Sequence, residues 1–113
     1  MDTALFERTV EQSSASLEGV TILVADDELI VRTLVREILS SLGAKVLVAK
    51  QGNEALEIIQ SEPVDLMILD IVMPDLDGFK TYERAIALKP DLVVVFCSGH
   101  AESGKIATLR TGG

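Results

Sequence analysis

The sequence predicts a single α/β domain in which a parallel sheet is doubly wound by helices. Short apolar runs alternate along the chain with stretches whose apolar residues recur every three or four positions. The runs at 21–25 and 66–69 are continuously apolar, as in strands that are buried on both faces. Each run is followed by an acid, Asp26 or Asp70, and ligands of open α/β sheets bind at the carboxyl ends of strands. We therefore expect a site at that edge.

Composition limits the alternatives. The 113 residues suffice for one hydrophobic core and leave no room for two. Eighteen Asp and Glu against ten Lys and Arg give a net charge of −8, which argues against direct nucleic-acid binding and against an anionic membrane surface. The single cysteine, Cys97, excludes an internal disulfide, and the sequence shows no signal peptide or long apolar segment. We expect a cytoplasmic protein.

The first part of the chain predicts an extension followed by strand, helix, strand and helix. Residues 1–19 are expected to be a linker, either a disordered leader or a short docking helix with Leu5, Phe6 and Val10 on one face. After the strand at 21–25, apolar residues at helical spacing predict a helix over 31–42 that Gly43 caps. A strand over 45–49 and a helix from Gly52 to Pro63 follow. This alternation favours right-handed parallel crossovers.

The second part continues the alternation. After the strand at 66–69, Phe79, Tyr82 and Ile86 predict the inner face of a third helix. The β-prone run over 92–97 predicts a fourth strand, and a fourth helix is expected over 102–111. The domain is thus expected to occupy residues 20–113.

Three acids are expected to meet where the first and third strands end. If these strands are parallel neighbours, Asp26, Asp27 and Asp70 lie at one edge of the sheet. Their mutual repulsion is relieved most simply by a hard divalent cation. An oxygen-only cluster with room for water suits Mg²⁺.

The motifs together resemble the receiver domain of two-component response regulators. The resemblance spans about 21–113 and rests on the following residues: Asp26-Asp27, Asp70, Met73-Pro74, Asp77-Gly78 and Ser98-Gly99. It implies a flavodoxin-like (CheY-like) sheet with strand order 2-1-3-4. It also implies a protein that works as a signalling switch and is not an enzyme.

The resemblance implies roles for individual residues. Asp70 would accept a phosphoryl group from a sensor histidine kinase or phosphotransfer protein. Asp27, Asp70 and the backbone carbonyl of Val72 would bind Mg²⁺ directly, with Asp26 acting mainly through water. The hydroxyl of Ser98 would contact the phosphoryl group and act as the switch.

The chain departs from the family pattern at its end. Receivers continue into a fifth strand that ends in Lys-Pro and a fifth helix, whereas this sequence stops at Gly113, and Lys105 lies in the wrong element to replace the lysine. We expect both elements to be missing, residues 93–96 to form an exposed sheet edge, and apolar surface to be uncovered beside the first helix. Self-association as a homo-oligomer, or folding back of residues 5–10, would compensate.

Two other functions stay open. One is an interaction module of receiver fold that is not phosphorylated. The other is a phosphatase of the haloacid dehalogenase type, but that family uses an Asp-x-Asp pattern, whereas Asp26 and Asp27 are adjacent.

Several residues resemble site residues and are expected to have other roles. Asp75 and Asp77 suit turn formation and helix N-terminal charge better than metal binding. His100 is expected to be a solvated loop residue, and Met67, Met73 and Cys97 are expected to pack in the core.

Overall fold

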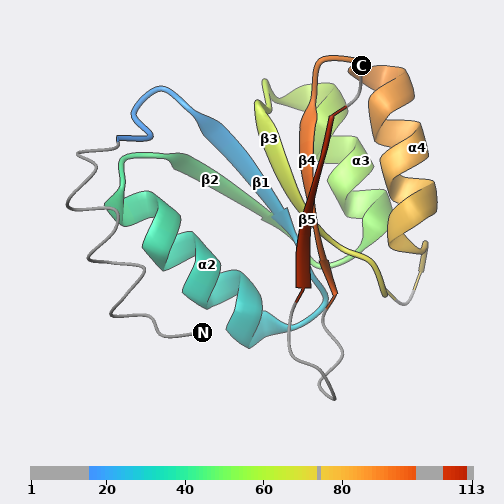
Figure 1. Cartoon of the computed structure of the whole chain (residues 1–113), viewed down its shortest axis with the longest axis horizontal. Coiled ribbons are helices and arrows are strands. Elements are labelled where there is room, and N and C mark those ends of the chain that lie inside the picture. Colours follow the sequence, from blue (N-terminus) through green and yellow to red (C-terminus); the bar gives the residue numbers. More distant parts are fainter. Residues whose placement is uncertain (1–15, 74, 99–105, 112–113) are drawn as a thin grey trace.

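The chain folds around one five-stranded sheet. A computed structural model describes residues 16–73, 75–98 and 106–111, with backbone alone for Ser98 and for 106–111. The strand order is β2-β1-β3-β4-β5 (Figure 1). The strands are β1 (Thr21–Ala25), β2 (Lys45–Ala49), β3 (Leu66–Asp70), β4 (Val93–Ser98) and β5 (Ile106–Thr111). Strands β1 to β4 are parallel, which confirms the predicted class and the order 2-1-3-4.

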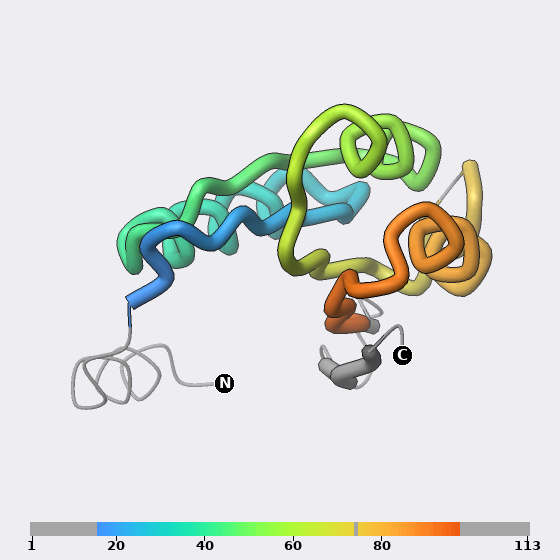
Figure 2. The backbone as a smooth tube through the Cα atoms, turned by 90° about the horizontal axis from the view of Figure 1, so that it is seen from above, coloured from blue at the N-terminus to red at the C-terminus, as the bar shows by residue number. Residues whose placement is uncertain are grey.

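Three helices lie on the two faces of the sheet. They are α2 (Leu29–Ser41), α3 (Gly52–Ser61) and α4 (Gly78–Leu88). Helices α3 and α4 lie side by side, and α2 lies apart from them (Figure 2). Helices α3 and α4 share one apolar cluster with the sheet, whereas α2 packs on the alternate strand residues, which point to the opposite face. The sheet is therefore doubly wound, as the alternation of elements predicts.

Successive side chains of β3 point to opposite faces of the sheet and belong to two separate cores. Met67 and Leu69 point toward α3 and α4 and are fully buried, whereas Leu66 and Ile68 point toward α2 and are partly exposed. Met73 is also buried in the core under α3 and α4, so both methionines that were predicted to pack in the core do so. The face toward α2 also buries Ile22 and Val24 of β1, but most of the buried apolar side chains belong to the face toward α3 and α4.

Helix α2 is less buried than its periodicity predicts. It contains no buried residue, and Leu29, Ile30 and Leu34 are exposed. Gly43 follows its end with φ +99°, the left-handed conformation expected of a glycine cap. The apolar surface expected beside the first helix is thus present in the described part of the chain.

The expectation for the end of the chain is wrong over 106–111. This segment is strand β5, which pairs antiparallel with β4 from Val93↔Thr111 to Ser98↔Ile106, and no helix covers these residues. Its β-branched residues, Ile106, Thr108 and Thr111, favour a strand over a helix. The sheet therefore has a fifth strand, but an antiparallel one, and the backbone edge at 93–96 is paired and not exposed.

Other expectations fall on parts that the structure does not describe. The segment carrying Leu5, Phe6 and Val10 lies outside the described residues, as do His100 and Lys105. No helix in the described ranges is long and apolar enough to span a membrane.

Candidate functional site

Three carboxylates converge at the carboxyl ends of β1 and β3. The register pairs Ala25 with Leu69, so the residues that follow, Asp26 and Asp70, lie side by side. One oxygen each from Asp26, Asp27 and Asp70 lies within 4.8 Å of the others. Asp26 and Asp70 are each only 3% exposed, whereas Asp27 is exposed to solvent. The structure thus brings together the three predicted acids.

Backbone and side-chain hydrogen bonds fix the corner at Asp26. Its N–H donates to the carbonyl of Ala49 on β2 at 3.0 Å, and its Oδ1 accepts from the N–H of Glu28 at 2.9 Å. Arg32 Nη1 donates to the Asp26 carbonyl oxygen at 2.7 Å. Sequence analysis missed Arg32, although a basic residue one turn into the helix after the acidic corner was a usable signal.

Asp70 is held by the backbone that follows it. The N–H of Val72 donates to Asp70 Oδ1 at 3.2 Å, and the N–H of Ile71 donates to the carbonyl of Cys97 on β4 at 3.0 Å. The Ile71 bond continues the β3–β4 ladder beyond the pairing of Asp70 with Cys97. The carboxylate is therefore oriented by a short loop that is itself tied to the next strand.

Gly78 allows α4 to begin against this loop. Its N–H donates to the carbonyl of Ile71 at 2.7 Å. A Cβ atom at this position would lie 2.5 Å from the carbonyl oxygen of Asp70 and 2.5 Å from Ile71 Cα, both of which belong to the backbone. A side chain is excluded here unless the backbone at Asp70 and Ile71 moves.

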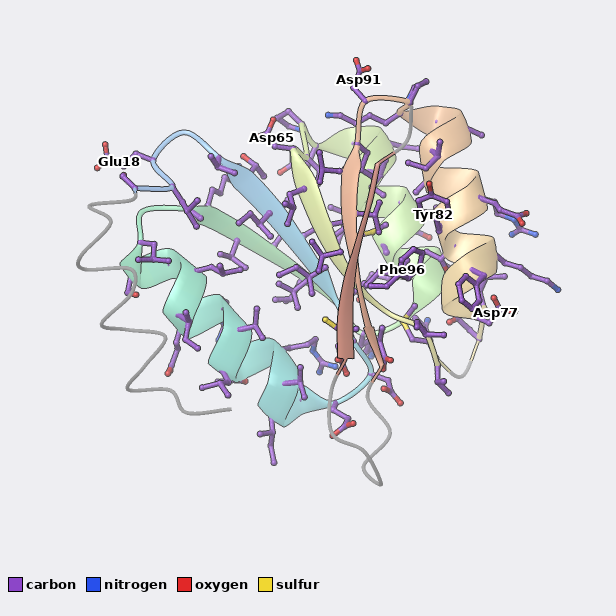
Figure 3. All side chains as sticks on the ribbon, in the orientation of Figure 1. Glu18, Asp65, Asp77, Tyr82, Asp91 and Phe96 are labelled. Carbon is purple, nitrogen blue, oxygen red and sulfur yellow. The ribbon has the colours of Figure 1, made fainter. Side chains whose placement is uncertain are left out.

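Asp77 and Asp75 serve helix N-termini. Asp77 Oδ1 accepts from the N–H of Lys80 at 2.9 Å and caps α4, at whose first turn it lies (Figure 3). Asp75 bridges to another helix, because its two carboxylate oxygens accept from the N–H groups of Gly52 and Asn53 at the start of α3, each at 2.9 Å. These bonds confirm the predicted helix N-terminal role.

The hydrogen bonds to α3 help to lower the pKa of Asp75. Burial acts to raise the pKa of Asp75, but the backbone N–H groups of Asn53 and Gly52, together with those of Leu76 and Asp75 itself, outweigh it and lower the pKa. The sequence predicted that Asp75 contributes negative charge at a helix N-terminus, but not which helix. The helix is α3, whose N–H donors belong to Gly52 and Asn53, 23 and 22 residues before Asp75. No local pattern carries that long-range contact.

The remaining predicted residues lie around the acidic cluster. Ser98 is the last residue of β4, one position beyond Cys97, the register partner of Asp70; its side chain lies outside the described part. Val72 lies two residues after Asp70, and its side chain is exposed. Cys97 is partly buried.

The cluster fits a hard divalent cation. Its donors are three carboxylates, two of them almost fully buried. A buried group of like charges within 4.8 Å favours a cation that neutralises it. Oxygen-only ligands select Mg²⁺ or Ca²⁺ over softer metals.

The sheet order and the acidic edge define a receiver-type signalling domain. The family model of the response regulator receiver domain matches residues 22–113. The chain belongs to this family.

Three relatives illustrate the match. The chain is 38% identical over 85 residues to the autoinducer 1 sensor kinase/phosphatase LuxN of Vibrio campbellii, covering 75% of this chain and 10% of LuxN. It is 38% identical over 80 residues to the response regulator receiver protein CpdR of Brucella abortus, covering 71% of this chain and 67% of CpdR. The response regulator TrrA of Thermotoga maritima, in complex with Mg²⁺ and BeF, aligns with a TM-score of 0.68 and 34% identity, covering 73% of this chain and 71% of TrrA.

Proposed function

We propose that this domain is the phosphoacceptor of a two-component system, in which Asp70 receives a phosphoryl group from a sensor histidine kinase or a phosphotransfer protein. The observation that carries the proposal is the convergence of Asp26, Asp27 and Asp70 within 4.8 Å at the carboxyl edge of the sheet. Membership of the receiver family and the alignment with TrrA, solved in complex with Mg²⁺ and BeF, support it. An interaction module that is not phosphorylated has no need of this cluster.

The chemistry is an in-line transfer to a carboxylate. A carboxylate oxygen of Asp70 attacks phosphorus, so that a P–O bond forms while the P–N bond to the donor imidazole breaks. Asp26, Asp27, Asp70 and the Val72 carbonyl would hold Mg²⁺, which when bound neutralises negative charge on the phosphoryl oxygens. The hydrogen bond from Val72 N–H to Asp70 Oδ1 keeps the carboxylate oriented for attack.

The modified state is the output of the domain. An acyl phosphate at Asp70 adds negative charge and acceptor oxygens beside the end of β4. We assign the hydroxyl of Ser98 to contact these oxygens, because Ser98 follows the register partner of Asp70. A change in conformer population at this edge then alters a protein-binding surface. We assign the domain no turnover of a separate substrate, and its place is the cytoplasm.

Intact-mass analysis after incubation with acetyl phosphate and Mg²⁺ tests the proposal. We expect one phosphoryl group on the wild-type chain and none on Asp70→Asn, because the amide is a poor nucleophile. Removal of Mg²⁺ with a chelator, or Asp27→Ala, should abolish or strongly slow labelling.

Asp91→Asn provides a matched control, since Asp91 is exposed in the turn before β4 at the opposite end of the sheet (Figure 3). It should be labelled like wild type. Equal labelling of Asp70→Asn would remove Asp70 from its role, and no labelling of the folded wild-type chain would favour the module that is not phosphorylated.

A further inference from the structure

Three aromatic rings gather between α4 and β4, and none of them belongs to the acidic cluster. The ring centroid of Phe96 on β4 lies 5.4 Å from that of Phe79 and 5.2 Å from that of Tyr82, both on α4. Figure 3 shows Tyr82 and Phe96 facing each other. With Glu83 these rings line a hollow of about 330 Å³. Phe79 is 55% exposed, so the ring that was predicted to face the core instead forms an open wall of this hollow.

Glu83 gives the hollow a negative rim. Phe79, Tyr82 and Glu83 are spaced i, i+3 and i+4 on α4 and therefore share one side of the helix. Glu83 is exposed, and among the described residues it belongs to no ion pair, the pair formed there being Lys45 with Glu62. The carboxylate at this hollow thus forms no ion pair with a described cation, although Lys80 lies three residues before it on α4.

We propose that this hollow, lined by Phe79, Tyr82, Glu83 and Phe96, binds an arginine side chain of a partner polypeptide. Ring faces attract cations through their quadrupole, and a guanidinium group is planar and stacks on them. The same group donates hydrogen bonds to a carboxylate such as Glu83. The net charge of −8 makes the whole domain complementary to a basic partner.

The geometry selects arginine over other cations. Phe79 is more than half exposed, so the three rings do not form a closed cage around a compact quaternary ammonium group. The rings of Phe79 and Phe96 are inclined at 41° and those of Tyr82 and Phe96 at 55°, so a flat group can stack on one ring while its edge reaches the rim. Lysine lacks the planar surface that this arrangement uses.

Intrinsic fluorescence gives a specific readout. Tyr82 is the single tyrosine of the chain, and the chain has no tryptophan. We would titrate the full chain with N-acetyl-Gly-Arg-Gly-amide and, as a neutral isostere, with the same peptide carrying citrulline. The arginine peptide should change tyrosine emission in a saturable way with a Kd on the order of millimolar, and the citrulline peptide should bind several-fold more weakly.

Matched variants locate the binding. Glu83→Gln removes the charge at constant shape and should weaken binding by about threefold, and Phe79→Leu should weaken it to a similar extent. Glu57→Gln on α3 changes the net charge equally at an exposed position outside the hollow and should leave binding unchanged. Because Glu83 is outside the acidic cluster, Glu83→Gln should still be phosphorylated on Asp70, so this proposal and the proposed function fail separately.

Three results would overturn the proposal. One is equal binding of the arginine and citrulline peptides, and a second is an equal loss in Glu57→Gln and Glu83→Gln. The third concerns Arg110, which β5 places in register with Val94, two residues from Phe96. Suppose that Arg110→Gln changes the tyrosine emission in the absence of peptide, and that the peptide binds this variant but not the wild-type chain. The hollow would then bind this chain's own arginine and not a partner's.

Discussion

The two faces of the sheet are packed very differently. Toward α3 and α4, the sheet contributes fully buried side chains such as Met67, Leu69 and Val94. Toward α2, the corresponding side chains of Leu66 and Ile68 are only partly buried, and α2 itself has no buried residue among those described. The α2 face does bury Ile22 and Val24 of β1, so the contrast lies in β3 and in α2 itself. The comparison indicates that the first face contributes more of the buried core, while the second keeps apolar surface exposed.

The acidic cluster joins these two faces. Asp26 and Asp27 precede α2, and Arg32 of that helix binds the Asp26 backbone. Asp70 belongs to the other side, where Gly78 packs against its backbone and Asp75 ties the following loop to α3. Asp70, the proposed phosphoacceptor, is thus anchored to the well-packed side, and its acidic partners are anchored to the looser one.

The largest expected change in stability comes from truncating one of two neighbouring residues of β3 that point to opposite faces of the sheet. Met67→Ala should lower the free energy of unfolding by about 2–5 kcal/mol, because it opens a cavity in a fully buried core. Ile68→Ala, on the α2 side, should cost less than about 2 kcal/mol because its side chain is already partly solvated. Urea unfolding of both variants measures the difference, and equal costs would contradict the contrast between the faces.

A smaller effect is expected where the well-packed side meets the site. Gly78→Ala places a Cβ against the Asp70 backbone, so we expect a loss of about 1–3 kcal/mol together with slower phosphorylation. Gly19→Ala serves as the control. Gly19 has φ +82°, but a Cβ added there would meet no atom within 4 Å. Only backbone strain therefore lowers the stability of this variant, and its phosphorylation should not change. Normal labelling of Gly78→Ala would separate α4 from the site.

Asp75 offers a prediction that depends on pH. Asp75→Asn should cost about 1 kcal/mol at neutral pH, since an amide cannot accept from both α3 N–H groups. The pKa of Asp75 is lowered from its ordinary value of 3.8, so its stabilisation is complete above that value and is lost as the pH falls through the lowered pKa. The stability difference between wild type and variant should therefore shrink in acid. A difference that stays constant down to the lowest pH at which the chain folds would contradict this linkage.

The sequence predicts the parallel part of the fold well because each of its elements is locally encoded. For β1 to β4 and for the three helices, the local signals agree with the observed elements. These signals are continuous apolar runs, helical periodicity and glycines at turns. The three acids of the site follow from strand ends alone, since parallel neighbours place their carboxyl ends together. Here local pattern and tertiary structure coincide.

The errors arise where tertiary contacts decide. Residues 106–111 were expected in a helix, but pairing with β4 makes them a strand. Phe79 was expected inward, yet Thr81 and Ala85 occupy the buried face of α4, and Phe79 remains at its border. The bond from Asp75 to α3 depends on a loop-to-helix distance that no periodicity encodes.

The smallest expected effect tests whether the α2 face is as open as its exposed side chains indicate. Ile30 is 80% exposed on α2, so Ile30→Gln should change stability by no more than about 0.5 kcal/mol, and glutamine is a slightly better helix former. Urea unfolding measures the stability of this variant, and light scattering over a range of concentrations measures its apparent mass. A loss above about 1 kcal/mol would mean that Ile30 is covered in solution, either by residues 1–15 or by a second copy of the chain. Scattering separates these cases, because only a second copy makes the apparent mass and the stability depend on concentration. Either result would break the contrast between the faces, whereas a neutral variant and a monomer would establish α2 as free apolar surface beside the acidic cluster.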